Sequence, residues 1–179
     1  MILNNKAKIL IIDDEQIVLD SCSQILANGD YLIATANNGN LGLKKLPEFQ
    51  PDLVFVDLKM PGISGFEVIQ NIHDFDPTIV TIVITGFATI SSAVDAMKGG
   101  AFDFLPKPFT PDELRLIARR GLEKRRLELE TRALRREREI MREHFAAIVS
   151  HELKSPLNAV QQNLYVLADE LTTLLTNEQ

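Results

Sequence analysis

The sequence predicts an α/β domain, in which helices cover both faces of a parallel sheet, joined to a long helix. Three observations lead to this fold class. Short apolar runs recur five times with helical patterns between them, which is the arrangement of βαβ units. The runs are apolar at almost every position, as in strands buried on both faces. The chain then becomes highly charged, and from residue 112 to residue 155 it contains no Pro and a single Gly.

The predicted strands are the apolar runs, each bounded by polar or turn-forming residues. They lie at residues 8–12, 31–36, 53–56, 79–84 and 101–105. The intervening helical patterns lie at residues 16–27, about 39–46, 64–74 and 89–98. Cys22 falls among apolar residues of the first helix, so we expect it to belong to the core. In sheets of this kind the functional residues gather at the carboxyl ends of the strands.

A long helix is predicted from residue 110 onward. Thr110 can cap its N-terminus, and the residues that follow, Pro111, Asp112 and Glu113, suit a first turn. Apolar residues then recur at every seventh position, whereas the partner positions of the heptad are polar: Leu127, Leu134, Met141 and Ile148 against Lys124, Thr131 and Arg138. A half-filled heptad predicts a helix that coils with a partner without a tight seam. We therefore expect a parallel homodimer through residues 110–179.

Composition and charge exclude several classes of function. With 45% hydrophobic and 25% charged residues, the chain has the composition of a globular protein, and no apolar run approaches the ~18 residues of a membrane span. The net charge of −6 is uneven: residues 1–109 carry 7 basic and 13 acidic side chains, and residues 110–143 carry 11 and 8. Because acids are interleaved with these arginines, we expect no nucleic-acid binding. A single Cys and the lack of a signal peptide favour a cytoplasmic location.

Polar side chains of complementary types follow the predicted strands. They are Asp13 and Asp14 after the first strand, Asp57 after the third, Thr85 after the fourth and Lys107 after the fifth. In a parallel sheet all five would meet at one edge. Two carboxylates about 4 Å apart repel by about 4 kcal/mol at an effective dielectric constant near 20, so three together favour a bound divalent cation. An all-oxygen site suits Mg²⁺, with Mn²⁺ as a possible substitute, and the arrangement is typical of phosphoryl transfer.

Chemistry assigns a role to each of these groups. Asp57 is the candidate nucleophile, which would form an acyl phosphate. Asp13 and Asp14 would hold the metal directly or through water, together with Asp57 and the backbone carbonyl of Lys59. Lys107 would bind the phosphoryl oxygens as a compact cation. Thr85 would donate a hydrogen bond to them and be drawn inward.

The motifs around these residues resemble those of the receiver (response-regulator) domain of two-component signalling. They are DDE at 13–15, VDLKMPGISG at 56–65, TGFA at 85–88 and FDFLPKPF at 102–109. The resemblance covers roughly residues 6–125, and we place the receiver domain at residues 1–125. It implies a flavodoxin-like, doubly wound sheet of strand order 2-1-3-4-5, dependence on Mg²⁺, phosphorylation of Asp57 and a cis peptide bond between Lys107 and Pro108.

The resemblance also implies a switch and a phosphodonor. Thr85 would respond to the phosphate, and the switch aromatic would be Phe104, where many members of the family have Tyr. A phenyl ring can still swing between pockets but has no hydroxyl group with which to hydrogen-bond. The phosphodonor would be a histidine kinase or a phosphotransfer protein. The stretch from Thr85 to Phe109 is most similar to receivers of transcriptional activators.

A second motif lies within the long helix. HELKSPL at 151–157 resembles the phosphoacceptor box on the first dimerisation helix of histidine kinases. By this resemblance His151 is a phosphoacceptor and Glu152 is its general base, and Pro156 is expected to interrupt the helix. Residues 145–179 would be this first helix, in an incomplete dimerisation domain. Residues 110–144 would be a signalling coiled-coil linker, continuous with the last receiver helix.

These predictions combine into one hypothesis and one alternative. In the hypothesis, phosphorylation of Asp57 acts through the linker on His151, within a parent protein that is a histidine protein kinase, a phosphotransferase acting on a nitrogenous group. ATP would act only through a C-terminal domain that this sequence lacks, so the chain alone is not expected to autophosphorylate. In the alternative, phosphorylation controls dimerisation or binding and the helical stalk is non-catalytic. The sign of regulation stays open.

Overall fold

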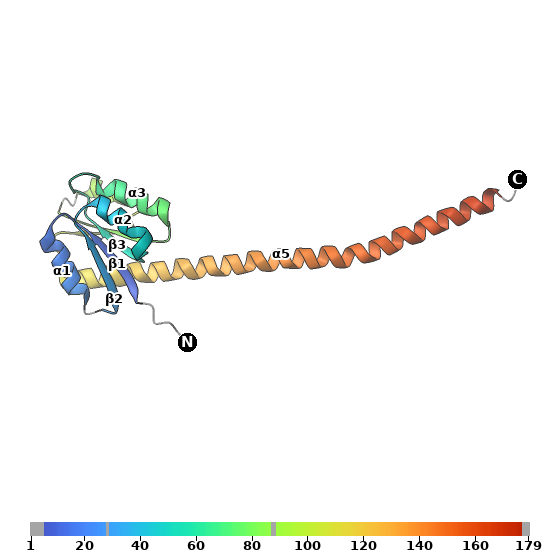
Figure 1. Cartoon of the computed structure of the whole chain (residues 1–179). Coiled ribbons are helices and arrows are strands. Elements are labelled where there is room, and N and C mark those ends of the chain that lie inside the picture. Colours follow the sequence, from blue (N-terminus) through green and yellow to red (C-terminus); the bar gives the residue numbers. More distant parts are fainter. Residues whose placement is uncertain (1–5, 28, 87–88, 177–179) are drawn as a thin grey trace. The chain divides into compact units, whose positions relative to one another are not determined.

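Five parallel strands form one sheet in the computed structural model, which describes residues 6–27, 29–86 and 89–176 and, in the last part of the final helix, only some side chains. The strands are β1 (Ala7–Ile12), β2 (Tyr31–Ala36), β3 (Leu53–Val56), β4 (Val80–Thr85) and β5 (Asp103–Pro106). Their order is β2-β1-β3-β4-β5, as expected, and Figure 1 labels the first three of them. The last two strands begin one and two residues later than predicted.

The helices are α1 (Gln16–Ala27), α2 (Gly39–Phe49), α3 (Gly65–Phe75), α4 (Ile90–Lys98) and α5 (Pro111–Thr176). α2 runs past its predicted end and includes Pro47, and the residue that caps its C-terminus, Gln50, has a left-handed conformation with φ of 51°. α3 and α4 each begin with a reciprocal capping box, Ser64 with Glu67 and Thr89 with Ser92, which satisfies backbone N–H groups that have no partner within the helix.

Two hydrophobic cores lie on the two faces of the sheet. One core joins β1, β3 and β4 to α2, α3 and α4 through buried residues that include Leu46, Val68 and Ala96. The other joins the same strands to α1 and to the first turns of α5, and it includes Cys22 and Leu114. Figure 1 shows α2 and α3 on one side of the sheet, with α1 and the beginning of α5 on the other. Both faces are therefore covered, and Cys22 is fully buried, as predicted.

The first turns of α5 approach the sheet very closely at Gly121. A β-carbon built at this position would collide with the side chain of Leu53 and lie 3.1 Å from Ile82. The close approach explains why the only Gly between residues 112 and 155 stands here. The start of α5 matches the sequence prediction, since the Thr110 hydroxyl accepts from the Glu113 N–H at 3.3 Å while the Glu113 carboxylate accepts from the Thr110 N–H at 2.7 Å.

The chain divides into two compact units, residues 1–130 and residues 131–179. α5 continues through Pro156 to Thr176, so the expected interruption of the helix at this proline was wrong. Proline removes one backbone hydrogen bond, and a helix can continue around such a defect when the neighbouring turns remain bonded. Among the described residues, no helix is long and apolar enough to cross a membrane.

Candidate functional site

The predicted site residues meet at the carboxyl edge of the sheet. Asp13 follows β1, Asp57 follows β3, Thr85 ends β4 and Lys107 follows β5. Backbone hydrogen bonds continue the sheet into this region: the Asp57 N–H donates to the Ile12 carbonyl at 2.9 Å, and the Lys107 N–H donates to the Thr85 carbonyl at 2.9 Å. Each functional side chain is thus held by the strand that precedes it and by a neighbouring strand.

Three carboxylates form an acidic cluster at this edge. Asp13, Asp14 and Asp57 each offer an oxygen that lies within 4.8 Å of the others. Asp13 and Asp57 are buried, with 1% and 6% of their surface exposed, while Asp14 is open to solvent. Burial raises the pKa of Asp13, although its hydrogen bonds with the Lys107 ammonium and the Glu15 N–H oppose this effect. The cluster therefore holds negative charge in a place where water screens it poorly.

Lys107 is the cation of the site. Its ammonium nitrogen lies 2.7 Å from Asp13 Oδ2, 3.1 Å from Glu15 Oε1 and 3.5 Å from Asp57 Oδ2. Burial alone would lower the pKa of Lys107, but the hydrogen bond to Asp13 and the charges of Asp13 and Asp57 outweigh it, and the pKa is raised. The peptide bond between Lys107 and Pro108 is cis, as expected. Glu15, the last residue of the DDE motif, also contacts Lys107, and the motif does not predict this contact.

The loop after β3 brings the backbone close to Asp57. The Lys59 N–H lies 3.4 Å from Asp57 Oδ1, and the Lys59 side chain is exposed. The Gly65 N–H donates to the Leu58 carbonyl at 3.0 Å, and a β-carbon at Gly65 would meet the Asp57 carbonyl oxygen and lie 2.6 Å from the Leu58 α-carbon. The loop can therefore close only with Gly at position 65, a requirement that motif spacing alone did not reveal.

The two predicted switch residues lie on neighbouring strands. Thr85 is fully buried at the end of β4, and Phe104 lies on β5, whose register pairs it with Val83. Phe104 is half-buried and packs against the core formed with α2, α3 and α4. The structure thus places Phe104 on the face of the sheet that α2, α3 and α4 cover.

The second predicted site is not described at the side-chain level. His151 and Glu152 belong to α5, but their side chains lie outside the described residues. The roles of both residues therefore stay predictions from the motif.

The donor set at the sheet edge fits a divalent cation. The three clustered side chains supply only oxygen atoms, and one of them is open to solvent, which leaves coordination positions for water. Asp13, Asp14 and Asp57 would hold the ion. Mg²⁺ suits such a site because it binds through a few carboxylates and retains several waters.

Comparison with known proteins identifies the fold and the family. The response regulator receiver domain family matches residues 9–119, which include all five strands except the first two residues of β1. The chain belongs to the response regulator receiver family. The residues matched contain the acidic cluster, Thr85, Phe104 and Lys107, and exclude His151. The receiver fold and a part in two-component signalling thus follow, whereas the resemblance to a histidine-kinase box receives no support.

Solved structures give the same answer. A receiver domain protein from Methanospirillum hungatei has a TM-score of 0.66 and 30% identity, with 69% of this chain and 99% of that chain covered. The NtrX structure from Brucella abortus has a TM-score of 0.69 and 34% identity, and the match covers 73% of this chain but only 30% of the NtrX chain. The receiver is therefore matched by an isolated domain and by part of a larger protein.

Curated relatives are transcriptional regulatory proteins by name. The C4-dicarboxylate transport regulatory protein DctD of Pseudomonas aeruginosa is 39% identical over 131 residues, which is 73% of this chain and 28% of the relative. The alginate biosynthesis regulatory protein AlgB of Pseudomonas aeruginosa is 31% identical over 169 residues, or 92% of this chain and 38% of the relative. This receiver chain therefore spans less than two fifths of the length of either protein.

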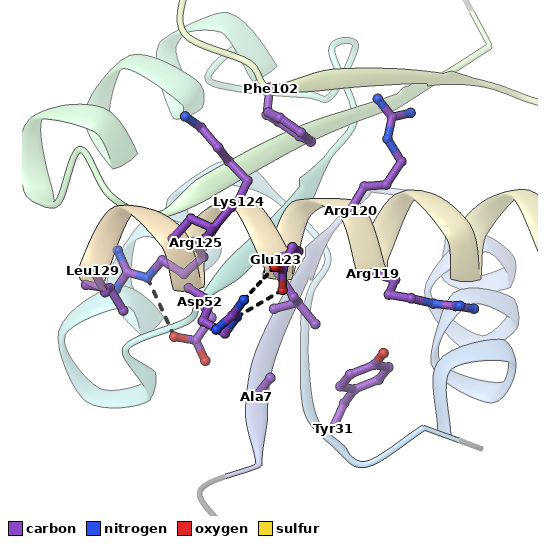
Figure 2. Close-up of a pocket in the computed structure, with 13 residues that line it drawn as sticks. Ala7, Tyr31, Asp52, Phe102, Arg119, Arg120, Glu123, Lys124, Arg125 and Leu129 are labelled. Carbon is purple, nitrogen blue, oxygen red and sulfur yellow. Dashed lines mark hydrogen bonds and ion pairs between the residues drawn. The ribbon is translucent and has the colours of Figure 1, made fainter. Parts of the chain in front are cut away.

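A separate concave region lies at the opposite edge of the receiver's sheet. It has a volume of about 920 Å³ and is lined by the ends of strands and by α5, including Ala7, Asp52, Phe102 and Leu127 (Figure 2). Ala7 begins β1 and Asp52 precedes β3, which puts this groove at the amino ends of the strands. It is thus remote from the acidic cluster and takes no part in the site described above.

Proposed function

We propose that the receiver accepts a phosphoryl group on Asp57 in an Mg²⁺-dependent reaction. The observation that supports this role is the position of the Asp57 carboxylate, which is buried, clusters with two other acids and lies 3.5 Å from the Lys107 ammonium. A carboxylate oxygen of Asp57 would attack phosphorus, the bond from phosphorus to the leaving group would break, and the leaving group would depart with its electron pair. A bound divalent cation would supply neutralising charge for the transferred oxygens.

The other residues of the site would bind and hold the product. Lys107 would turn from Asp13 toward an oxygen of the phosphoryl group, a short movement because its ammonium already contacts both acids. The Thr85 hydroxyl would donate to another oxygen. Such a movement at the end of β4 would favour one of two positions of the half-buried Phe104 ring, which is the two-state element that a phosphate switch requires.

The test is the mass of the intact protein after incubation with acetyl phosphate and Mg²⁺. Wild type should gain one phosphoryl group, and Asp57→Asn should gain none. Asp20→Asn is a matched control, because Asp20 is an exposed acid of α1 with the same charge. Phosphorylation of Asp57→Asn to the level of wild type, or a folded wild type that is never modified, would contradict the proposal.

We further propose that the long helix forms a parallel homodimer through residues 110–179 and transmits the phosphorylation state of the receiver along the chain. The exposed heptad residues of α5, such as Leu134 and Met141, support this part. Phosphorylation would change the packing or the register of the paired helices. The phosphodonor would be a histidine kinase or a phosphotransfer protein, which is the usual partner of a receiver.

A second candidate function concerns His151. In a protein that also carries an ATP-binding domain, His151 would accept phosphate from ATP with Glu152 as its base, and the receiver would regulate this step. The sequence HELKSPL supports it. The experiment joins the chain to such a domain and measures acid-labile, base-stable label from ATP, with His144→Gln as the control for His151→Gln. Label that persists in His151→Gln contradicts a phosphoacceptor role and leaves α5 as a non-catalytic stalk.

A further inference from the structure

An apolar row lies exposed on one face of α5. Leu127, Leu134, Met141 and Phe145 have 48%, 61%, 64% and 69% of their surface accessible. Single exposed apolar residues are ordinary on protein surfaces. Here, however, the spacing of seven residues aligns the first three along one stripe of the helix, and Phe145 occupies the adjoining position. This row of residues, the heptad stripe, is a surface that another helix can cover.

The charged residues on the two edges of the heptad stripe are sorted by sign over residues 130–142, whereas Glu128, beside Leu127 on the otherwise basic edge, departs from this pattern. If the apolar row occupies heptad position d, Glu130 and Glu137 occupy position g and Arg135 and Arg142 occupy position e. All four side chains are exposed. One edge of the stripe is therefore acidic over two successive heptads, and the other edge is basic over the same length.

We infer that this charge pattern makes α5 bind a second copy of the chain in a parallel arrangement and in register. In a parallel pair, position g of one helix lies beside position e of the next heptad of the partner, five residues further on. Glu130 then faces the partner's Arg135, and Glu137 faces the partner's Arg142. Both pairs occur twice because the two copies are related by symmetry. The inference deepens the proposed homodimer and rests on it.

The same residues disfavour the other arrangements. In an antiparallel pair, position g faces position g and position e faces position e, so Glu would meet Glu and Arg would meet Arg. In a parallel pair shifted by one heptad, Glu130 of one chain would face the partner's Glu128, and Glu137 of the other chain would face the partner's Val149. The in-register parallel pair is thus the arrangement in which these four charges all find opposite partners.

Charge pairs within a single solvated helix do not require this pattern. Pairs within one helix need opposite charges three or four residues apart, such as Arg126 and Glu130, which are 3.8 Å apart and well exposed. Such pairs do not require that position g be acidic and position e basic in both heptads. Arg138, at the polar partner position of the stripe, also suits a pair of two helices, because its stem can pack while its guanidinium reaches solvent.

Charge-swap variants of the whole chain test the inference. Glu130→Arg with Glu137→Arg makes both edges basic, and Arg135→Glu with Arg142→Glu makes both edges acidic. Each variant alone should raise the dimer dissociation constant at least about tenfold, since four attractive pairs become repulsive. A mixture of the two variants, and the variant that carries all four changes, should both dimerise as wild type does. Sedimentation equilibrium measures the constants, and circular dichroism shows that each chain remains folded.

Disulfide trapping tests the orientation directly. Leu127→Cys and Met141→Cys, made in separate chains, should each cross-link to the same position in a second copy. An antiparallel pair could bring only one of these positions against itself. The natural Cys22 is fully buried and does not interfere.

The outcomes separate this inference from the proposed phosphorylation. A wild-type chain that stays monomeric, charge swaps that leave the dissociation constant unchanged, or a cross-link at only one position would each overturn the inference. Asp57 phosphorylation, measured by mass on the same samples, is unaffected by any of these results. Failure of phosphorylation with intact, charge-dependent dimers would conversely overturn the proposed receiver chemistry alone.

Discussion

The ammonium of Lys107 lies closer to Asp13, at 2.7 Å, than to Asp57, at 3.5 Å. The cation thus bridges the acid that would hold a metal and the acid that would accept the phosphoryl group. Its positive charge compensates two buried carboxylates in the resting protein. It is also placed to move toward Asp57 when a phosphoryl group is bound there. Its removal should therefore affect both the stability of the protein and the rate of phosphorylation.

We predict that Lys107→Met slows phosphorylation by acetyl phosphate at least about tenfold, because a hydrogen bond to a charged group is worth about 1.5–3 kcal/mol. The variant should also be less stable than wild type, and Mg²⁺ should restore much of the difference, since the ion can neutralise the same acids. Rates come from intact mass and stability from thermal unfolding. Lys44→Met, at an exposed site on α2, is the control. Equal phosphorylation rates in Lys107→Met and wild type would show that Lys107 takes no part in the reaction.

The sheet edge could be predicted from the sequence because it depends on local patterns. Apolar runs fix the strands, and in a parallel sheet the residues that follow them must share one edge. This logic alone predicts that Asp13, Asp57, Thr85 and Lys107 lie together. The contact of Glu15 with Lys107 could not be derived in this way, because it depends on how a side chain turns within the assembled edge.

Metal binding should stabilise the folded protein. If Mg²⁺ binds the acidic cluster, a concentration one hundred times its dissociation constant should raise the free energy of unfolding by about 2.7 kcal/mol. We predict that Asp13→Asn loses most of this increase, because Asp13 is the most buried acid of the cluster. Thermal unfolding with and without Mg²⁺ measures the effect, and Asp20→Asn should respond as wild type does. An equal response of Asp13→Asn would place the ion elsewhere.

Cys22 should be inert in the folded protein. It is fully buried, and burial raises its pKa to about 12, with the charge of Asp13 adding to the effect. We predict that a thiol reagent at pH 8 modifies Cys22 only as fast as the protein unfolds, and that denaturant exposes it at once. Because the unfolded thiol loses its proton near pH 9 and the folded one does not, stability should fall as the pH rises above about 9. Rapid modification of native protein would show that the core around α1 opens readily.

The contacts of Arg125 were also beyond prediction from the sequence. Arg125 lies in the charged stretch of α5, where it resembles its solvated neighbours. In the structure it is largely buried: its guanidinium donates to Asp76 Oδ2 at 3.0 and 3.1 Å and lies 3.6 Å from Asp52 Oδ1. Figure 2 shows the side chain directed from α5 toward Asp52. These acids precede β4 and β3, so their contact with α5 follows from tertiary packing and not from any pattern along the helix.

Arg125 should therefore stabilise the receiver where its exposed neighbours do not. We predict that Arg125→Met lowers the free energy of unfolding by about 1–2 kcal/mol, because two carboxylates lose a largely buried partner. Arg126→Met breaks only solvent-screened pairs with Glu123 and Glu130, so it should leave the free energy of unfolding nearly unchanged.

The pH dependence of the same pair provides a second measurement. The pKa of Asp76 is lowered: burial opposes the shift, but the hydrogen bonds from Thr78 and the Arg125 charge outweigh it. A lowered folded-state pKa gives stability that is present above the unfolded value of 3.8 and is lost as the pH falls through the folded value. Chemical denaturation across the acid range should therefore show the Arg125→Met deficit shrinking below pH 3.8. A deficit that stays constant as Asp76 takes up its proton would mean that Arg125 acts through packing of its stem rather than through its charge.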